Sequence, residues 1–117
     1  MAITEFGKAV RKARIDADVT LASMADELQT TPSFISAMEM GRKKVPAEWI
    51  RKIEVYFSSH GVSVRLGELA DVANKTVQID GLSPAQQMLV AGFARVNLDE
   101  QELAKFAQLL AIKKGDR

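Results

Sequence analysis

The sequence contains no cysteine, only one histidine and only three prolines among 117 residues. Without cysteine there can be no disulfide and no thiolate metal site, and a reducing cytoplasm is the simplest setting. His60 has no serine, cysteine or carboxylate partner at catalytic spacing, and the chain has no glycine-rich phosphate loop. These absences argue against an enzyme, and we expect neither a cofactor nor a metal ion.

Long apolar runs are missing as well, although 47% of the residues are hydrophobic. No segment approaches the roughly 18 consecutive apolar residues that a membrane span needs. The first five residues contain neither a basic start nor an apolar segment, so we expect no secretory signal and no membrane association. The length suits one domain, or one small domain with a short appendage.

Neither sign of charge is in excess, because 16 basic and 15 acidic residues leave a formal net charge of +1. The basic residues are nevertheless clustered, at Lys8, Arg11, Lys12 and Arg14 and again at residues 42–44. Such a cluster can be an ordinary solvated face or a set of phosphate contacts. The segment that the two clusters flank decides between these interpretations.

Apolar residues recur at helical spacing along most of the chain, whereas strand patterns are scarce. Capping and turn residues divide the first part into helices expected at residues 4–17, 21–28, 32–40, 47–58 and 66–73. Gly41 suits the left-handed position after the third helix. Gln29 lies in the turn between the second and third of these helices.

The last third of the chain predicts a helical hairpin at residues 82–117, after a linker at residues 74–81. Ser83 and Asp99 are suitable N-caps, and each is followed three residues later by the Gln or Glu of a capping box. Residues 76–79 alternate like a strand, but four residues are too few to decide. The sequence therefore predicts an all-α protein, in which a domain of about five helices at residues 1–73 precedes the hairpin.

The segment from residue 20 to residue 41 has the length of two short helices joined by a tight turn, as in a DNA-binding helix-turn-helix. On the second helix, Ile35 and Met38 face the first one, while Ser33, Ser36 and Ala37 lie on the other side. Serine can exchange hydrogen bonds with base edges, and an alanine methyl can contact thymine. A face of such small residues can approach the bases of a major groove closely.

At this point the sequence resembles the Xre family, the helix-turn-helix type of lambda repressor and Cro, over residues 4–58. The resemblance is carried by FGKAVRKAR at residues 6–14, VTLASMA at residues 19–25 and TPSFISAMEMGR at residues 31–42. It implies a lambda-repressor-like bundle whose helix at residues 32–40 lies in the major groove. The chain departs from the family's pattern at Asp18 and Gln29, where glycine is common. A positive φ at Gln29 would cost about 1 kcal/mol or somewhat more.

The resemblance also implies roles for individual residues. The positions that read base edges in the family are occupied by Thr31, Ser33, Ser36 and Ala37. The positions that bind phosphates are occupied by Thr20, Leu21, Arg42, Lys43 and Lys44. A structural salt bridge of the family corresponds to Arg14 and Glu39. For the serines and lysines the alternative is plain solvation, and for Phe34 core packing competes with a contact to DNA.

One recognition helix contacts few base pairs, so tight specific binding calls for two subunits on paired half-sites. The hairpin has apolar faces that need a partner, and a second copy is the preferred one. The residues expected at the dimer interface are Leu89, Phe93, Val96, Leu103, Phe106 and Leu110. The alternative is that the hairpin folds back onto its own first domain. The leading hypothesis is therefore a homodimeric repressor that binds a palindromic operator in double-stranded DNA.

Two other functions stay open at this stage. Some Xre-type proteins are antitoxins, which neutralise a small toxin with the segment outside the DNA-binding domain. An antitoxin that also represses its own operon is therefore the second hypothesis. Activation of transcription stays open too, because Asp26 and Glu27 form an acidic patch that could contact RNA polymerase.

Overall fold

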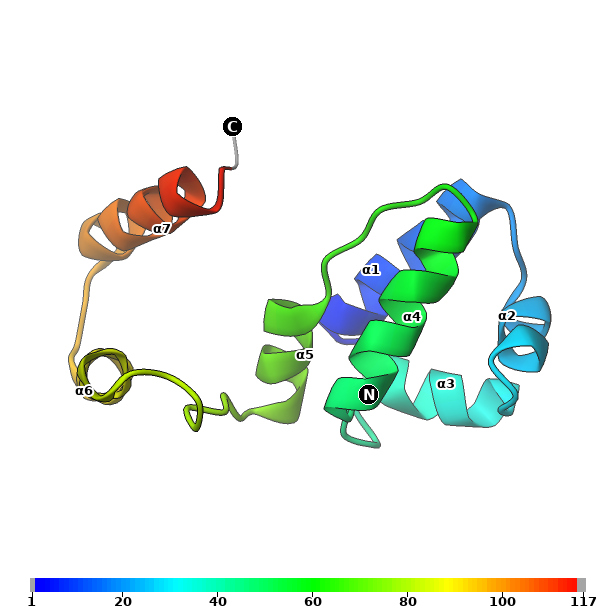
Figure 1. Ribbon diagram of the computed structural model, residues 1–117, viewed down its shortest axis with the longest axis horizontal. Coiled ribbons are helices and arrows are strands. Elements are labelled where there is room, and N and C mark those ends of the chain that lie inside the picture. The colour runs from blue at the N-terminus through cyan, green and yellow to red at the C-terminus, as the bar shows by residue number, and fades with distance from the viewer. Residues whose placement is uncertain (1, 116–117) are drawn as a thin grey trace. The chain divides into compact units, whose positions relative to one another are not determined.

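The computed structural model describes residues 2–115, which form seven helices and no strand (Figure 1). The prediction of an all-α protein is confirmed. The helices are α1 (Glu5–Ala17), α2 (Leu21–Glu27), α3 (Pro32–Glu39), α4 (Ala47–Ser59), α5 (Gly67–Asn74), α6 (Pro84–Arg95) and α7 (Glu100–Lys114). The chain divides into two compact units, Met1–Val77 with α1 to α5 and Gln78–Arg117 with α6 and α7.

The first three helices begin in the same way, at a threonine that caps the helix. The side chains of Thr4, Thr20 and Thr31 each accept a hydrogen bond from the backbone N–H three residues later. Such a cap satisfies one of the N–H groups that a helix leaves without an internal partner, and its loss typically costs about 1 kcal/mol. The caps therefore fix where these helices start.

Left-handed residues end the helices or turn the chain between them. Asp18 follows α1 with φ 57°, and Gly41 follows α3 with φ 75°. Gln29, between α2 and α3, has φ 56°, so the expected strained turn is present. Lys75 ends α5 with φ 57°, which no residue pattern in the sequence indicated.

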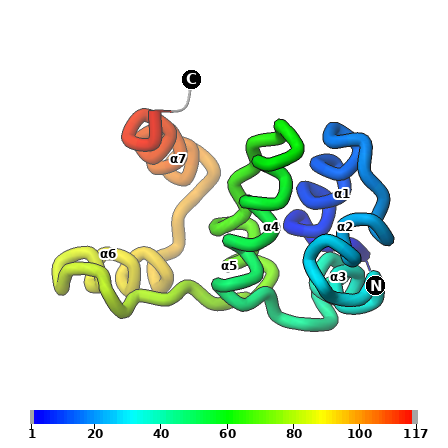
Figure 2. The backbone as a smooth tube through the Cα atoms, turned by 45° about the vertical axis from the view of Figure 1, so that its right-hand side comes forward, coloured from blue at the N-terminus to red at the C-terminus, as the bar shows by residue number. Residues whose placement is uncertain are grey.

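The core of the first unit lies around α1, which contacts α3, α4 and α5, while α2 packs on α3. Figure 2 shows α1 and α4 side by side, with α2 and α3 next to each other. Burying each large apolar side chain contributes roughly 1.5–3 kcal/mol. The buried apolar residues are Phe6, Val10, Ala13, Met24, Ala25, Ile35, Met38, Val45, Ile53, Tyr56, Phe57, Leu66 and Ala70. Leu21, Leu28 and Trp49, which the helical pattern places in the core, are only partly buried.

The second unit has a different character, because none of its described residues is buried. The rings of Phe93 and Phe106 meet edge to face, with centroids 5.4 Å apart. Asp99 and Glu102 form the expected capping box at the start of α7. Nine large apolar side chains between residues 88 and 112 are 44% to 74% exposed. They are Met88, Leu89, Phe93, Val96, Leu103, Phe106, Leu109, Leu110 and Ile112.

The segment between the two units differs from its prediction in two respects. Residues 76–79, which alternate like a strand, have no regular structure. Asn74, assigned to the linker, is the last residue of α5 and packs within the first unit. Its side chain binds the backbone of Val45, a contact between residues that are 29 positions apart. Local sequence patterns cannot indicate a contact over that separation.

Candidate nucleic-acid interface

The outer side of α3 carries the four residues predicted to read bases. Thr31 and Ser33 are exposed, and Ser36 and Ala37 are partly exposed. The opposite side of the helix is anchored in the core, where Ile35 is buried. The hydroxyl oxygen of Thr31 accepts from the N–H of Phe34 at 3.1 Å, so its proton is still able to donate to a ligand. The helix thus presents a surface of small, weakly polar side chains at these four positions.

Glu39 fixes this helix against α1 through its side chain. The carboxylate is 1% exposed and takes two hydrogen bonds from the Arg14 guanidinium, one of them 3.2 Å from Nη2 to Oε1. The structure therefore contains the ion pair that the resemblance implies. Arg11, whose spacing predicts that it faces away, joins the pair through Nε at 3.0 Å from Oε1. Two arginines of α1 thus hold the last residue of α3.

The backbone of Glu39 makes a second connection to the start of α1. Its carbonyl oxygen accepts from the Thr4 N–H at 3.1 Å and from the Thr4 hydroxyl at 2.8 Å. A Cβ atom on Gly7 would lie only 2.3 Å from this oxygen, so any larger residue would force the helices apart. Gly7 is therefore needed for the close approach of α1 to α3.

A basic loop follows α3 at residues 41–46, and its first part is held by helix-ending hydrogen bonds. The N–H of Arg42 donates to the Ala37 carbonyl at 2.9 Å, and the N–H of Gly41 donates to the Met38 carbonyl at 3.2 Å. This is the Schellman arrangement, which glycine allows by taking a positive φ. The three basic side chains Arg42, Lys43 and Lys44 are all exposed.

The end of the basic loop is held by Asn74 of α5. The N–H of Val45 donates to Asn74 Oδ1 at 2.8 Å, and Asn74 Nδ2 donates to the Val45 carbonyl at 3.0 Å. Val45 is 2% exposed, so its backbone groups depend on this one amide for their hydrogen bonds. Asn74 is a positioning residue that the sequence analysis missed. With both ends fixed, the loop keeps its charges beside the C-terminal end of α3.

Two aromatic rings and two lysines lie next to this loop. The rings of Phe34 and Trp49 have centroids 5.0 Å apart, so packing is the role that the structure shows for Phe34. Lys43 Nζ lies 6.0 Å from the centroid of Phe34, and Lys52 Nζ lies 4.8 Å from that of Trp49. Cations are attracted to ring faces at these distances. Lys52 is a further basic residue near α3, and it was not predicted from the sequence. Its position one helical turn after Trp49 could have indicated that it lies beside this ring.

The N-terminus of α2 is the remaining predicted phosphate contact. Thr20 is exposed and its hydroxyl caps the helix at 3.0 Å from the Ser23 N–H, while Leu21 is partly buried. The first N–H groups of any helix lack internal partners. Nothing in the arrangement of α2 tests whether they bind a phosphate, so this role stays a prediction.

No protein-family model, curated protein or solved structure matches this chain. Within residues 2–115, no three side chains of the metal-binding types lie close enough to hold an ion. No helix in that part of the chain is both long enough and apolar enough to cross a membrane.

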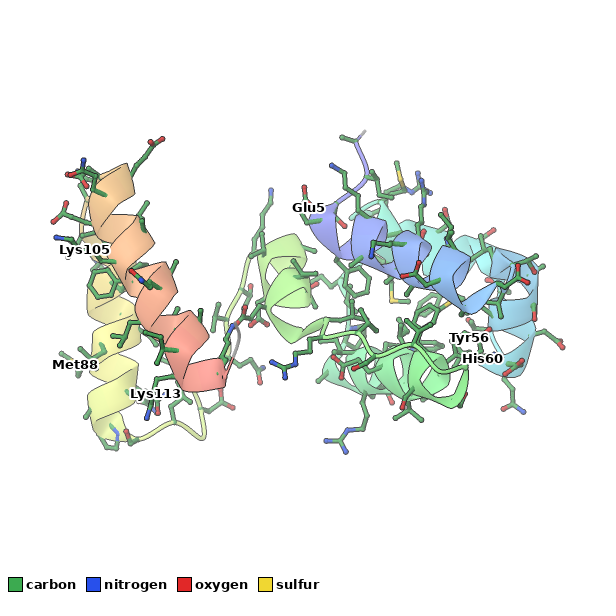
Figure 3. The ribbon with its side chains drawn as sticks, turned by 90° about the horizontal axis from the view of Figure 1, so that it is seen from above. Glu5, Tyr56, His60, Met88, Lys105 and Lys113 are labelled. Atoms are coloured by element: carbon green, nitrogen blue, oxygen red, sulfur yellow. The ribbon has the colours of Figure 1, made fainter. Side chains whose placement is uncertain are left out.

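A separate polar cluster lies near the C-terminal ends of α2 and α4. Figure 3 shows Tyr56 and His60 next to each other, and their ring centroids are 4.6 Å apart. His60 Nε2 lies 3.4 Å from a carboxylate oxygen of Glu27, a carboxylate partner that the spacing in the sequence did not indicate. The Tyr56 hydroxyl is buried without a hydrogen-bond partner among the described residues. Burial raises the pKa of Tyr56, the nearby Glu27 carboxylate raises it further, and Arg14 opposes the shift.

Proposed function

We propose that this chain is a cytoplasmic, sequence-specific DNA-binding regulator that represses transcription from a palindromic operator as a homodimer. In this proposal α3 lies in the major groove of double-stranded DNA. The observation that carries it is the combination of a small, accessible face on α3 with a fixed and exposed basic loop at the end of the same helix.

The small face of α3 suits contact with base edges. Ser33 and Ser36 can donate or accept hydrogen bonds, and the methyl group of Ala37 can contact thymine. None of these residues can make the bidentate contacts that arginine makes to guanine or glutamine to adenine. Specificity in this proposal therefore depends in part on water bridges and on the shape of the DNA.

The basic loop suits contact with the phosphate backbone. Backbone contacts set the register and orientation of a reading helix but carry little sequence information themselves. A loop that is fixed at both ends loses less conformational entropy on binding than a free one. The Schellman turn and the Asn74 amide therefore favour a defined position of Arg42, Lys43 and Lys44 relative to α3.

The first experiment is selection of bound sites from random DNA, followed by affinity titrations at several salt concentrations. Recovered sites should be two-fold symmetric, and the logarithm of the binding constant should fall linearly with the logarithm of salt. Lys43→Ala should reduce the magnitude of this slope by about 0.9 for each subunit that loses a phosphate contact. Lys105→Ala, which removes the same charge from exposed α7, is the matched control and should leave the slope unchanged.

Base reading has its own test at Ser36. Ser36→Ala should weaken binding to the selected site about two- to tenfold, which is the range for loss of one hydrogen bond. Binding to unrelated DNA should not change, because phosphate contacts dominate there. Failure to recover any preferred site, or equal weakening on all DNA, would argue against α3 as the reading helix.

A further inference from the structure

Helix α7 carries an apolar seam that its own unit leaves largely uncovered. The seam consists of Leu103, Phe106, Ala107 and Leu110, at the i, i+3, i+4, i+7 spacing that places side chains on one face of a helix. Its three large side chains are 44%, 46% and 57% exposed in the order of the chain. Phe93 of α6 covers only part of the seam, through its ring contact with Phe106. A large apolar area therefore remains without a partner.

The two ends of this seam carry opposite charges. Glu100 lies three residues before Leu103, and Lys113 lies three residues after Leu110, so both continue the same helix face. Glu100 and Lys113 are equally far along the chain from the point midway between Phe106 and Ala107, and so are Leu103 and Leu110. The two outer positions of the seam are both leucine. The two central positions hold one large residue and one small residue.

We propose that α7 pairs with α7 of a second copy of this chain, with the two helices running in opposite directions. The inference deepens the homodimer of the proposed function and rests on it. A two-fold axis between Phe106 and Ala107 places Leu103 opposite Leu110 of the second copy. It places Phe106 against Ala107, large against small, and Glu100 beside Lys113 at both ends. A two-fold interface of this kind is self-complementary and closed.

The direction of pairing follows from the charges. In a parallel pair, Glu100 would face Glu100 and Lys113 would face Lys113, and the two phenylalanines would meet at the same level. Like charges at facing helix positions are unfavourable, whereas the antiparallel pair joins opposite charges twice. The antiparallel direction is therefore preferred.

The small size of this unit also favours association with a second copy. Domains below roughly 40 residues usually need disulfides, a metal or oligomerisation to be stable. The second unit, Gln78–Arg117, is of this size, and the chain has no cysteine with which to form a disulfide. With no buried residue among those described, the unit gains its apolar burial by association.

Charge reversal in the full-length chain tests the pairing, with the dimer dissociation constant measured by sedimentation equilibrium. Glu100→Lys or Lys113→Glu alone puts like charges together at both ends and should raise this constant at least about fivefold. The double variant should return it to near the wild-type value, although it keeps the loss of helix-dipole stabilisation at both ends. Lys105→Glu, on the face opposite the seam, is the matched control and should have no effect.

Cross-linking tests the direction of pairing, and the absence of native cysteine makes single-cysteine variants simple to use. Residues 100 and 113 are about 20 Å apart along a helix, at 1.5 Å per residue. A short bismaleimide should therefore join Glu100→Cys to Lys113→Cys in a mixture of the two proteins. It should not join either variant to itself. Self-joining of both variants would show a parallel pair and overturn the proposal.

The remaining outcomes separate this inference from the proposed function. A chain that stays monomeric at every concentration, or a dimer indifferent to both single reversals, overturns the pairing of α7 even if DNA binding is found. A dimer that follows the charge pattern but selects no DNA site supports the pairing and contradicts the DNA-binding proposal. Circular dichroism of each variant confirms that its helices are intact.

Discussion

Replacing Arg14 with methionine should remove a large part of the stability of the first unit. Arg14 and Glu39 are both buried, at 9% and 1% exposure, and the pair joins α1 to α3. Removing one partner of a buried ion pair costs about 3–5 kcal/mol, because the other charge stays buried without compensation. Arg11 still contacts Glu39, but its side chain is 46% exposed and offsets little of that loss. Small proteins have only about 5–15 kcal/mol in total, so the effect is measurable.

The single tryptophan makes this measurement specific to the first unit. Trp49 lies on α4 and packs against Phe34, so its fluorescence reports the unfolding of residues near α3 and not that of the hairpin. Urea titration then gives the midpoint and slope, and an unchanged slope means that the midpoint shift is a change in stability. Arg11→Ala, which removes the half-exposed partner of Glu39 and leaves Arg14 in place, should cost less than about 1 kcal/mol.

A double replacement distinguishes the cost of leaving one buried charge without a partner from the net stabilisation that the ion pair provides. In Arg14→Met with Glu39→Leu, no charge is left buried, and replacing both partners of such a pair is often nearly neutral. We therefore expect the double variant to be clearly more stable than Arg14→Met alone. If Arg14→Met costs no more than Arg11→Ala, the buried pair is not what holds α3 against α1, and the reasoning is refuted.

Three further predictions use the same fluorescence assay. Asn74→Ala should cost at least about 2 kcal/mol, since two buried backbone groups of Val45 lose their partners; an unchanged midpoint would show that the amide does not hold the basic loop. Gln29→Gly should raise the free energy of unfolding by up to about 1 kcal/mol, because glycine takes the φ of 56° without strain, and a loss of stability would contradict this. The raised pKa of Tyr56 means that its neutral form is favoured in the folded state. Its contribution to the free energy of unfolding is therefore present below pH 10 and is lost as the pH rises through the folded pKa. Tyr56→Phe should therefore gain stability relative to the wild type as pH is raised from 9 to about 11, and a constant difference across that range would exclude the effect.

Helix positions in this protein were predictable because capping and periodicity act over three or four residues. Thr4, Thr20 and Thr31 mark helix starts from their chemistry alone, and all three cap helices in the structure. The positive φ of Gln29 was instead expected from the family resemblance, because glycine is common at that position of the turn. Helix caps depend only on neighbouring residues.

Contacts between distant residues were not predictable in the same way. Arg11 joins the Glu39 carboxylate because α1 and α3 cross closely at Gly7, a distance that periodicity cannot supply. Asn74 binds Val45 across 29 residues, so a segment assigned to a linker positions the basic loop. The exposed side of α3 could be predicted from helical periodicity, but the contacts that hold this helix and the basic loop in place could not.

Because none of the described residues of the hairpin is buried, its pairing would affect how the proposed regulator responds to its own abundance. If pairing of two chains supplies the missing burial, ordering of the hairpin and assembly become one step governed by mass action. Below the dissociation constant, the concentration of paired chains rises with the square of the total. A doubling of protein in the cell would then raise operator occupancy about fourfold at low saturation. The exposed hairpin would thus make control depend steeply on the amount of protein.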